Sequence, residues 1–171
     1  MDIQPLALDL KAKRSEMMTS ELEAVALRLF DQRGFVNVTV EEIASEARIS
    51  VRTFYRYFGA KEEVLQLRTE RRSVALRAAL EARPADEPPL RSLRLAFDEE
   101  FAAVDETLLR RWISVTSNTP SVLKGVLGAI QLRIHPVIAE FLGSRLGVPG
   151  SDLVPTMLAA AANGVIQAAH T

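Results

Sequence analysis

The side chains best suited to binding a charged partner lie between Ala47 and Lys61. This stretch contains no carboxylate and four cations: Arg48, Arg52, Arg56 and Lys61. Hydroxyl groups stand among them, on Thr53, Tyr55 and Tyr57. Guanidinium and ammonium groups bind phosphate oxygens, and an arginine can also donate two hydrogen bonds to guanine in the major groove. The stretch therefore indicates contact with the backbone and base edges of DNA.

Two short helices are predicted to position these side chains. Thr39, followed three residues later by Glu42, is a capping box that begins the first helix. Ser50 is placed to cap the second helix. Its apolar residues recur on one stripe at helical spacing: Val51, Phe54 and Phe58. A short helix with an apolar back and a cationic front, braced by a preceding helix, is what reading the major groove requires.

The alternative is that residues 39–61 form a helical hairpin with an ordinary solvated face, because arginines are common on exposed helices. We favour DNA binding because two caps, a short turn, an acid-free second helix and three hydroxyl side chains occur together.

The run from Leu22 to Leu65 resembles the amino-terminal domain of the TetR family of bacterial transcriptional regulators. The matching segments are Ala26–Phe30, Gly34–Phe35, Thr39–Ala44, Ala47, Ile49–Ser50, Thr53–Phe58 and Lys61–Leu65. They span about a quarter of the chain, and the remainder agrees in helical character and length. The resemblance implies an all-helical homodimer with a DNA-binding head and a divergent carboxy-terminal domain that binds a small effector.

The resemblance also implies which side chains meet DNA. The predicted DNA-binding residues are Thr39, Ser50, Val51, Arg52, Thr53, Tyr55, Arg56, Tyr57 and Lys61. By resemblance, the positions that usually hold DNA, mostly through phosphates, are Thr53, Tyr55, Tyr57 and Lys61, and the two caps Thr39 and Ser50 are expected to touch phosphate as well. Arg52 stands where many members have glycine, and we expect it to read a base. Arg48 stands where the family usually has glycine in the turn. A left-handed residue other than glycine costs roughly 1–2 kcal/mol, so either the turn geometry differs slightly or the chain accepts this cost.

The composition is that of an ordinary globular protein. Hydrophobic residues make up 48% and charged residues 25% of the 171 residues, and the net charge is −1. Any nucleic-acid contact must therefore come from a local patch. The sequence has no cysteine, which excludes disulfides, thiol catalysis and cysteine-ligated zinc. With no signal-peptide pattern and no run of about 18 apolar residues, we expect a cytoplasmic protein without a membrane span.

The predicted fold is all-α, with a helix-turn-helix head joined by a long helix to a helical body. The predicted parts are a tail (1–14), the DNA-binding domain (15–60), a connecting helix (61–83) and an effector-binding and dimerisation domain (90–171). Cations in the tail are suited to a basic arm on DNA, although such clusters are more often simply solvated. Pro84–Pro89 is the strongest break. Pro136 should kink or split the helix that begins at Pro120.

The sequence offers little support for an enzyme or a metal site. Neither His135 nor His170 has a metal-binding partner at helical spacing. The acidic run 98–100 lies on the polar side of an apolar helix face, where solvated carboxylates are the simpler interpretation. There is no phosphate-binding glycine loop and no nucleophile elbow. We expect no catalytic residue, metal or cofactor.

A pocket for an effector is predicted among the apolar helices of the body. The candidate effector-binding residues are Phe97, Phe101, Trp112, Ile130 and His135. Pockets between helices are mostly apolar with a few placed polar groups. Plain core packing fits each of these residues individually better than a pocket does, and the family resemblance is what favours the pocket.

The sequence thus predicts a dimeric repressor that a largely apolar small molecule releases from a palindromic operator. The alternative is a helical ligand-binding or interaction protein whose head has lost DNA binding. Arg48, in the turn, is the residue that favours this alternative. A helical enzyme is a third possibility and would need a catalytic set that the sequence does not reveal. Residues 151–171, which include the alanine-rich segment 156–169, and the helix before them are expected to form the dimer interface. Because no cap follows that segment, we also expect further carboxy-terminal residues in the native chain.

Overall fold

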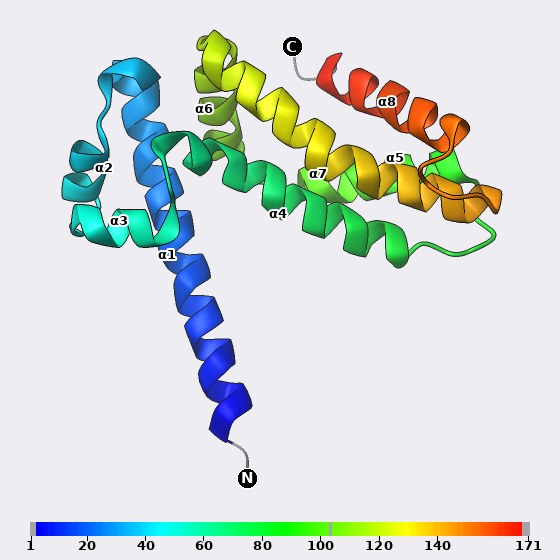
Figure 1. The fold of residues 1–171 in the computed structure, drawn as a ribbon, viewed down its shortest axis with the longest axis horizontal. Helices are drawn as coiled ribbons and strands as arrows, with labels where there is room; N and C mark the ends of the chain where they lie inside the picture. The colour runs from blue at the N-terminus through cyan, green and yellow to red at the C-terminus, as the bar shows by residue number, and fades with distance from the viewer. Residues whose placement is uncertain (1–2, 103, 169–171) are drawn as a thin grey trace. The chain divides into compact units, whose positions relative to one another are not determined.

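The computed structural model describes residues 3–102 and 104–168, and in these ranges the chain is helical and contains no strand (Figure 1). The helices are α1 (Ile3–Arg33), α2 (Val40–Glu46), α3 (Val51–Tyr57), α4 (Lys61–Glu81), α5 (Pro89–Ala102), α6 (Glu106–Ser117), α7 (Pro120–Leu146) and α8 (Leu153–Ala168), with a 3-10 turn, η1 (Phe35–Asn37). The predicted all-α fold is confirmed. The chain divides into two compact units, a head unit (Met1–Leu67 with Glu106–Leu123) and a body unit (Arg68–Asp105 with Lys124–Thr171).

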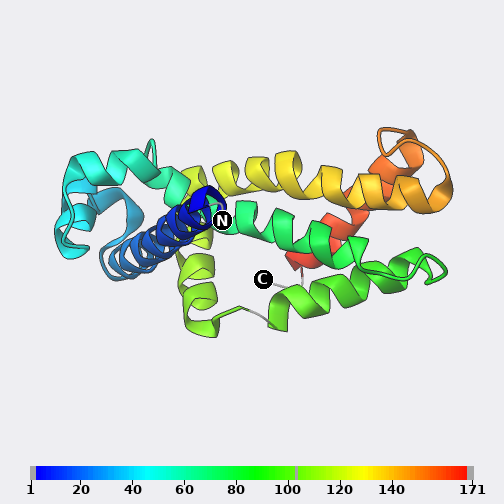
Figure 2. The ribbon, with the colours of Figure 1, turned by 90° about the horizontal axis from the view of Figure 1, so that it is seen from below.

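The head unit is built on the carboxy-terminal half of α1. Apolar side chains from α1, α2 and α3 fill its core, and the fully buried ones include Leu22, Phe30, Ile43 and Phe54. Figures 1 and 2 both show α2 and α3 on the same side of α1. This packing buries the apolar back of α3, so that the opposite face of the helix is turned to solvent.

Helix α1 begins earlier than the sequence predicts. The predicted tail covers residues 1–14, whereas the structure has helix from Ile3; residues 1–2 lie outside the described ranges. Pro5 falls in the first turn, where a helix needs no backbone donor and proline is tolerated. The following residues are mostly leucine, alanine, lysine and arginine, which are good helix formers.

Helix α6 belongs to the head unit, although the sequence predicts that everything after residue 90 forms the body. Helix α6 packs against α1, and the indole Nε1 of Trp112 donates a hydrogen bond of 3.0 Å to the carbonyl oxygen of Leu65. These contacts are the physical reason that residues 106–123 group with the amino-terminal helices.

The body unit has one apolar core to which α4, α5, α7 and α8 all contribute. Its buried members are Leu76, Leu80, Leu93, Ala96, Phe97, Ile134, Val137, Ile138, Ala139, Leu142 and Ala159. Pro136 neither ends nor splits α7, which continues through it to Leu146.

Helix α7 is the one described helix that is long and apolar enough to cross a membrane by length and composition. Several of its apolar side chains are buried in the body core. Its polar side forms two ion pairs with α4: Arg133 with Glu70 at 3.3 Å, and Glu140 with Arg77 at 2.8 Å. These features are typical of a core helix in a globular fold.

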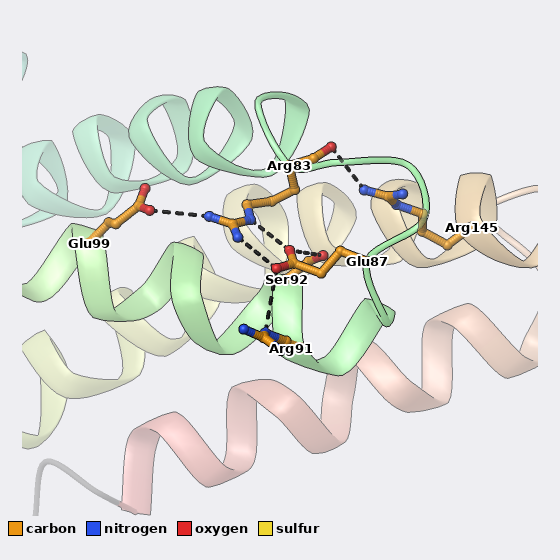
Figure 3. Close-up of polar contacts among 6 residues, drawn as sticks. All are labelled: Arg83, Glu87, Arg91, Ser92, Glu99 and Arg145. Carbon is orange, nitrogen blue, oxygen red and sulfur yellow. Dashed lines mark hydrogen bonds and ion pairs between the residues drawn. The ribbon is translucent and has the colours of Figure 1, made fainter.

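A polar cluster closes the turn between α4 and α5 (Figure 3). Arg83 donates from Nε and Nη2 to the two carboxylate oxygens of Glu87, each at 2.7 Å. Ser92 donates to the same carboxylate at 2.7 Å, and Arg145 of α7 donates to the carbonyl of Arg83 at 3.1 Å. The hydrogen bonds from Arg83 and then Ser92 lower the pKa of Glu87 from 4.5 to about 2.

Candidate nucleic-acid interface

The start of α2 is the capping box that the sequence predicts. The Thr39 side chain accepts a hydrogen bond from the Glu42 amide at 3.2 Å, and the Glu42 carboxylate accepts one from the Thr39 amide at 2.9 Å. The backbone bond from Thr39 is the main reason that the pKa of Glu42 is lowered, and Arg33 adds an ion pair at 3.1 Å. The entry into α2 is therefore held at its first turn.

The turn between α2 and α3 contains a left-handed residue other than glycine. Arg48 has φ 56°. Its amide donates to Ser45 O at 3.1 Å, and the next amide, of Ile49, donates to Ala44 O at 2.9 Å. This pair of bonds is the Schellman motif, in which glycine is favoured at the left-handed position. The turn therefore has the left-handed backbone geometry that glycine adopts without strain, and Arg48 adopts it at a cost in free energy.

Helix α3 is fixed by a cap at its start and by aromatic packing behind it. Ser50 accepts a hydrogen bond from the Thr53 amide at 3.0 Å, and the two side-chain oxygens lie 2.9 Å apart. Phe54 is fully buried, and its ring centroid lies 5.5 Å from that of Phe58, which is also buried. Both predicted caps, Thr39 for α2 and Ser50 for α3, are confirmed.

The outward face of α3 is cationic. Arg52, Tyr55 and Arg56 are exposed, and Thr53 and Tyr57 are half-buried at its edges. Arg56 stacks over the Tyr57 ring at 5.0 Å. Among the described residues, neither Arg52 nor Arg56 has a carboxylate partner. These guanidinium groups can therefore bind an anion without breaking an ion pair.

Lys61 is engaged within the head rather than extended into solvent. Its Nζ donates to the carbonyl oxygens of Phe35 at 2.8 Å and Val38 at 2.7 Å. The ammonium group also lies 4.5 Å from the centroid of the Phe35 ring. These contacts tie the start of α4 to the segment that leads into α2. A contact between Lys61 and a DNA phosphate stays a prediction.

The candidate effector residues fall in both units. Phe97 is buried in the body core, and Phe101 and Ile130 pack against it. His135 is 8% exposed, and its Nδ1 has no hydrogen-bond partner among the described residues. Trp112 belongs to the head unit, where its bond to Leu65 gives it a structural role. The effector contacts of all five residues remain predictions.

Besides the five candidate effector residues, the described part of the body unit contains two polar side chains with an unpartnered atom, Arg72 and Asn163. Arg72 lies over the rings of Phe97 and Phe101, at 5.7 and 5.1 Å, and forms an ion pair of 2.8 Å with Glu100. Its Nη2, like Nδ2 of the buried Asn163, has no partner among the described residues. Arg72 carries no local signal in the sequence, because its partners lie 25–29 positions away along the chain.

Two capped helices joined by a tight turn, with an apolar back on α1 and an acid-free cationic front, define a helix-turn-helix DNA-binding head. Residues 23–67 match the family model for bacterial regulatory proteins of the tetR family, and residues 87–171 match the model for the MftR C-terminal domain. The chain belongs to the TetR family and is a helix-turn-helix transcriptional regulator.

The chain is similar to two curated regulators over most of its length. It is 32% identical over 151 residues to the HTH-type transcriptional regulator TcmR of Streptomyces glaucescens, covering 84% of this chain and 66% of TcmR. It is 27% identical over 161 residues to MftR of Mycobacterium tuberculosis, a regulator named for mycofactocin biosynthesis, covering 92% of this chain and 80% of MftR.

Solved structures show the same fold. FadR of Thermus thermophilus, a TetR-family repressor solved in complex with lauroyl-CoA, is 28% identical with a TM-score of 0.54, over 84% of this chain and 76% of FadR. A TetR-family regulator from Mesorhizobium loti has a TM-score of 0.56 at 20% identity, over 86% and 77% of the two chains.

Proposed function

We propose that this protein is a homodimeric repressor that binds a palindromic operator through α3 and is released by a small, largely apolar effector. The observation that carries the proposal is the exposed, acid-free face of α3, on which Arg52 and Arg56 lack carboxylate partners among the described residues. Relatives named as transcriptional regulators support the same function. The protein works in the cytoplasm, where its operator is, and needs no catalytic group.

Within this function, Arg52 reads a base and the other residues of the interface position the head. Arg52 is exposed at the amino-terminal end of α3, where recognition helices contact base edges. Thr53, Tyr55, Arg56 and Tyr57 hold phosphates on either side of the groove. The caps Thr39 and Ser50 lie at helix amino termini, which favour phosphate oxygens.

The effector site lies in the body unit, around Phe97, Phe101 and Ile130. Its apolar side chains suit a hydrocarbon chain, and the unpartnered polar atoms of Arg72, His135 and Asn163 supply the few polar groups that orient a ligand. The lauroyl-CoA in complex with FadR has both a hydrocarbon chain and polar groups. Leaving buried polar atoms unpaired costs about 1–3 kcal/mol each, so a ligand that pairs them gains affinity.

The dimer forms through α8. One stripe of this helix is buried in the body unit, formed by Pro155, Ala159 and Asn163. Large apolar residues on the rest of its surface are exposed: Leu153, Val154, Met157, Leu158 and Val165. A contiguous apolar surface of this kind indicates a protein–protein contact. The predicted interface extends to residues 169–171, which lie outside the described ranges.

The test of DNA reading compares Arg52→Ala with the wild-type protein on an operator selected from random duplexes. Arg52→Ala should cost about 1–3 kcal/mol and relax the preference at one base pair in each half-site. If the variant lost affinity equally for every base at every position, Arg52 would be a backbone contact.

The test of the effector site uses lauroyl-CoA as the first probe and coenzyme A as the matched control. At a hundredfold excess over its dissociation constant, a bound effector should raise the free energy of unfolding by roughly 2.7 kcal/mol and release the operator. Arg72→Ala should weaken this response. A response to coenzyme A equal to that of lauroyl-CoA would contradict an apolar site.

A further inference from the structure

A groove of about 660 Å³ lies in the head unit between the amino-terminal part of α1 and the end of α3. It is lined by Leu10, Lys11, Arg14, Ser15, Arg56 and Tyr57. In Figure 1 the amino-terminal half of α1 continues past α3. Two of the lining residues, Arg56 and Tyr57, are the last residues of α3, so the groove lies where this helix ends. The groove shares Arg56 and Tyr57 with the predicted DNA-contacting face and is continuous with it.

The chemistry of the groove suits phosphodiester groups. Three of its lining side chains are cations (Lys11, Arg14 and Arg56), two carry hydroxyl groups (Ser15 and Tyr57), and none is a carboxylate. Lys11 and Arg14 are three residues apart on α1, so their side chains lie on one face of the helix. Cations clustered in this way repel one another, and an anionic partner offsets this repulsion.

The part of α1 from Leu10 to Met17 contains no buried residue. Every residue from Leu10 to Met17 is exposed, and the first fully buried residue after Leu10 is Leu22. Helices in proteins draw most of their stability from burying one face. Two turns of helix without a buried face therefore gain stability from a partner that lies along the groove.

We propose that this groove is a second DNA-contact site, which holds backbone phosphates flanking the major groove that α3 enters. The proposal rests on the proposed function, because it places DNA against α3. From Leu10 to Ser15, the residues of α1 that line the groove, the helix rises roughly 7.5 Å at about 1.5 Å per residue. At about 3.4 Å per phosphate on one strand, that length spans roughly two phosphates. The groove thus extends each half-site by about two base pairs without reading their sequence.

The experiment measures the salt dependence of affinity for an operator with about two flanking base pairs on each side and for the same operator trimmed to its half-sites. The variant is Lys11→Ala with Arg14→Ala, and alanine keeps the helix. On the long operator the slope of log affinity against log salt should fall by about 1.8 per head, at ~0.9 per phosphate. Between about 50 and 200 mM salt, the wild-type dimer should therefore lose about a hundredfold more affinity than the variant.

Lys13→Ala is the matched control. Lys13 is exposed on the same helix but does not line the groove. Its substitution should leave the slope unchanged, whereas Lys11→Ala alone should lower it by about 0.9 per head. If Lys11→Ala and Lys13→Ala lowered the salt slope equally, the effect would come from the general positive charge of the helix and not from the groove, and the proposal would be overturned.

A second measurement uses wild-type protein and changes only the DNA. Neutral methylphosphonates at the flanking positions should weaken binding of the wild type and leave the double variant unaffected. If the double variant bound the long operator with the wild-type slope, the groove proposal would fail while the proposed function stood. If the wild type showed no preference for any operator, the proposed function would fail. The groove would then be tested separately, by comparing the salt slopes of the wild type and the double variant on a long random duplex.

Discussion

Replacing Lys61 by methionine separates a structural role in the head from a contact with DNA. Methionine keeps an unbranched stem of similar length but loses the ammonium group that bonds Phe35 O and Val38 O at 2.8 and 2.7 Å. A hydrogen bond from a charged group contributes about 1.5–3 kcal/mol, and a cation over an aromatic ring about 0.5–1 kcal/mol at an exposed site. Because both bonds share one partly exposed ammonium group, we expect a total loss of about 2–3 kcal/mol.

The assay is urea unfolding followed by the fluorescence of Trp112. This is the only tryptophan in the sequence, and it lies in the same unit as Lys61. Lys124→Met, at an exposed position of α7, is the matched control and should change stability by less than about 0.5 kcal/mol. If Lys61→Met were as stable as this control and instead lowered the salt slope of operator binding by about one per head, Lys61 would be a phosphate contact and the structural reasoning refuted.

Three further results are expected. Arg48→Gly should raise the free energy of unfolding by about 1 kcal/mol because it relieves a left-handed strain; Arg48→Ala removes the same charge, keeps the strain and should show no such gain in urea unfolding. The pKa of Glu87 is about 2 in the folded chain against an ordinary 4.5, so its contribution to stability is present above pH 4.5 and is lost as the pH falls toward 2. Acid titration of unfolding should show this loss, and Glu87→Gln should remove it. Met157→Glu on the exposed face of α8 should give an 18.9 kDa monomer in sedimentation, while Val74→Glu, exposed on α4, should leave the dimer; a dimeric Met157→Glu protein would argue against the α8 interface.

The parts of the head that could be predicted from the sequence are those whose interactions are local. Thr39 and Ser50 each cap an amide three residues ahead, so the residue types at that spacing are sufficient. Phe54 and Phe58 lie one turn apart, and their periodicity alone predicts the buried side of α3. The sequence left open whether the turn at Arg48 differs in geometry or accepts a left-handed arginine, and the structure shows the left-handed residue, with φ 56°.

Contacts between residues far apart in sequence left no such signal. Lys61 bonds carbonyls 26 and 23 positions away, and nothing in the sequence distinguishes it from a lysine facing solvent. The ion pair of Arg72 with Glu100 spans 28 positions. The assignment of α6 to the head depends on its packing against α1, which periodicity within α6 cannot reveal.

The start of α1 illustrates a different limit. Pro5 and a mixed apolar and charged pattern indicate a tail, yet proline in a first turn is compatible with helix, and a helix can continue from a packed segment through good helix formers. The amphipathic period that would have signalled helix is missing because residues 10–17 have no buried face.

The central claim is that α3 reads DNA, and the most direct test is the affinity of the wild-type protein for duplexes from the region flanking its own gene. Fluorescence anisotropy at physiological salt should find one palindromic duplex that binds at least about a thousandfold more tightly than a shuffled duplex of the same length. This preference should be lost at one base pair per half-site in Arg52→Ala. Equal affinity for all duplexes would contradict the claim.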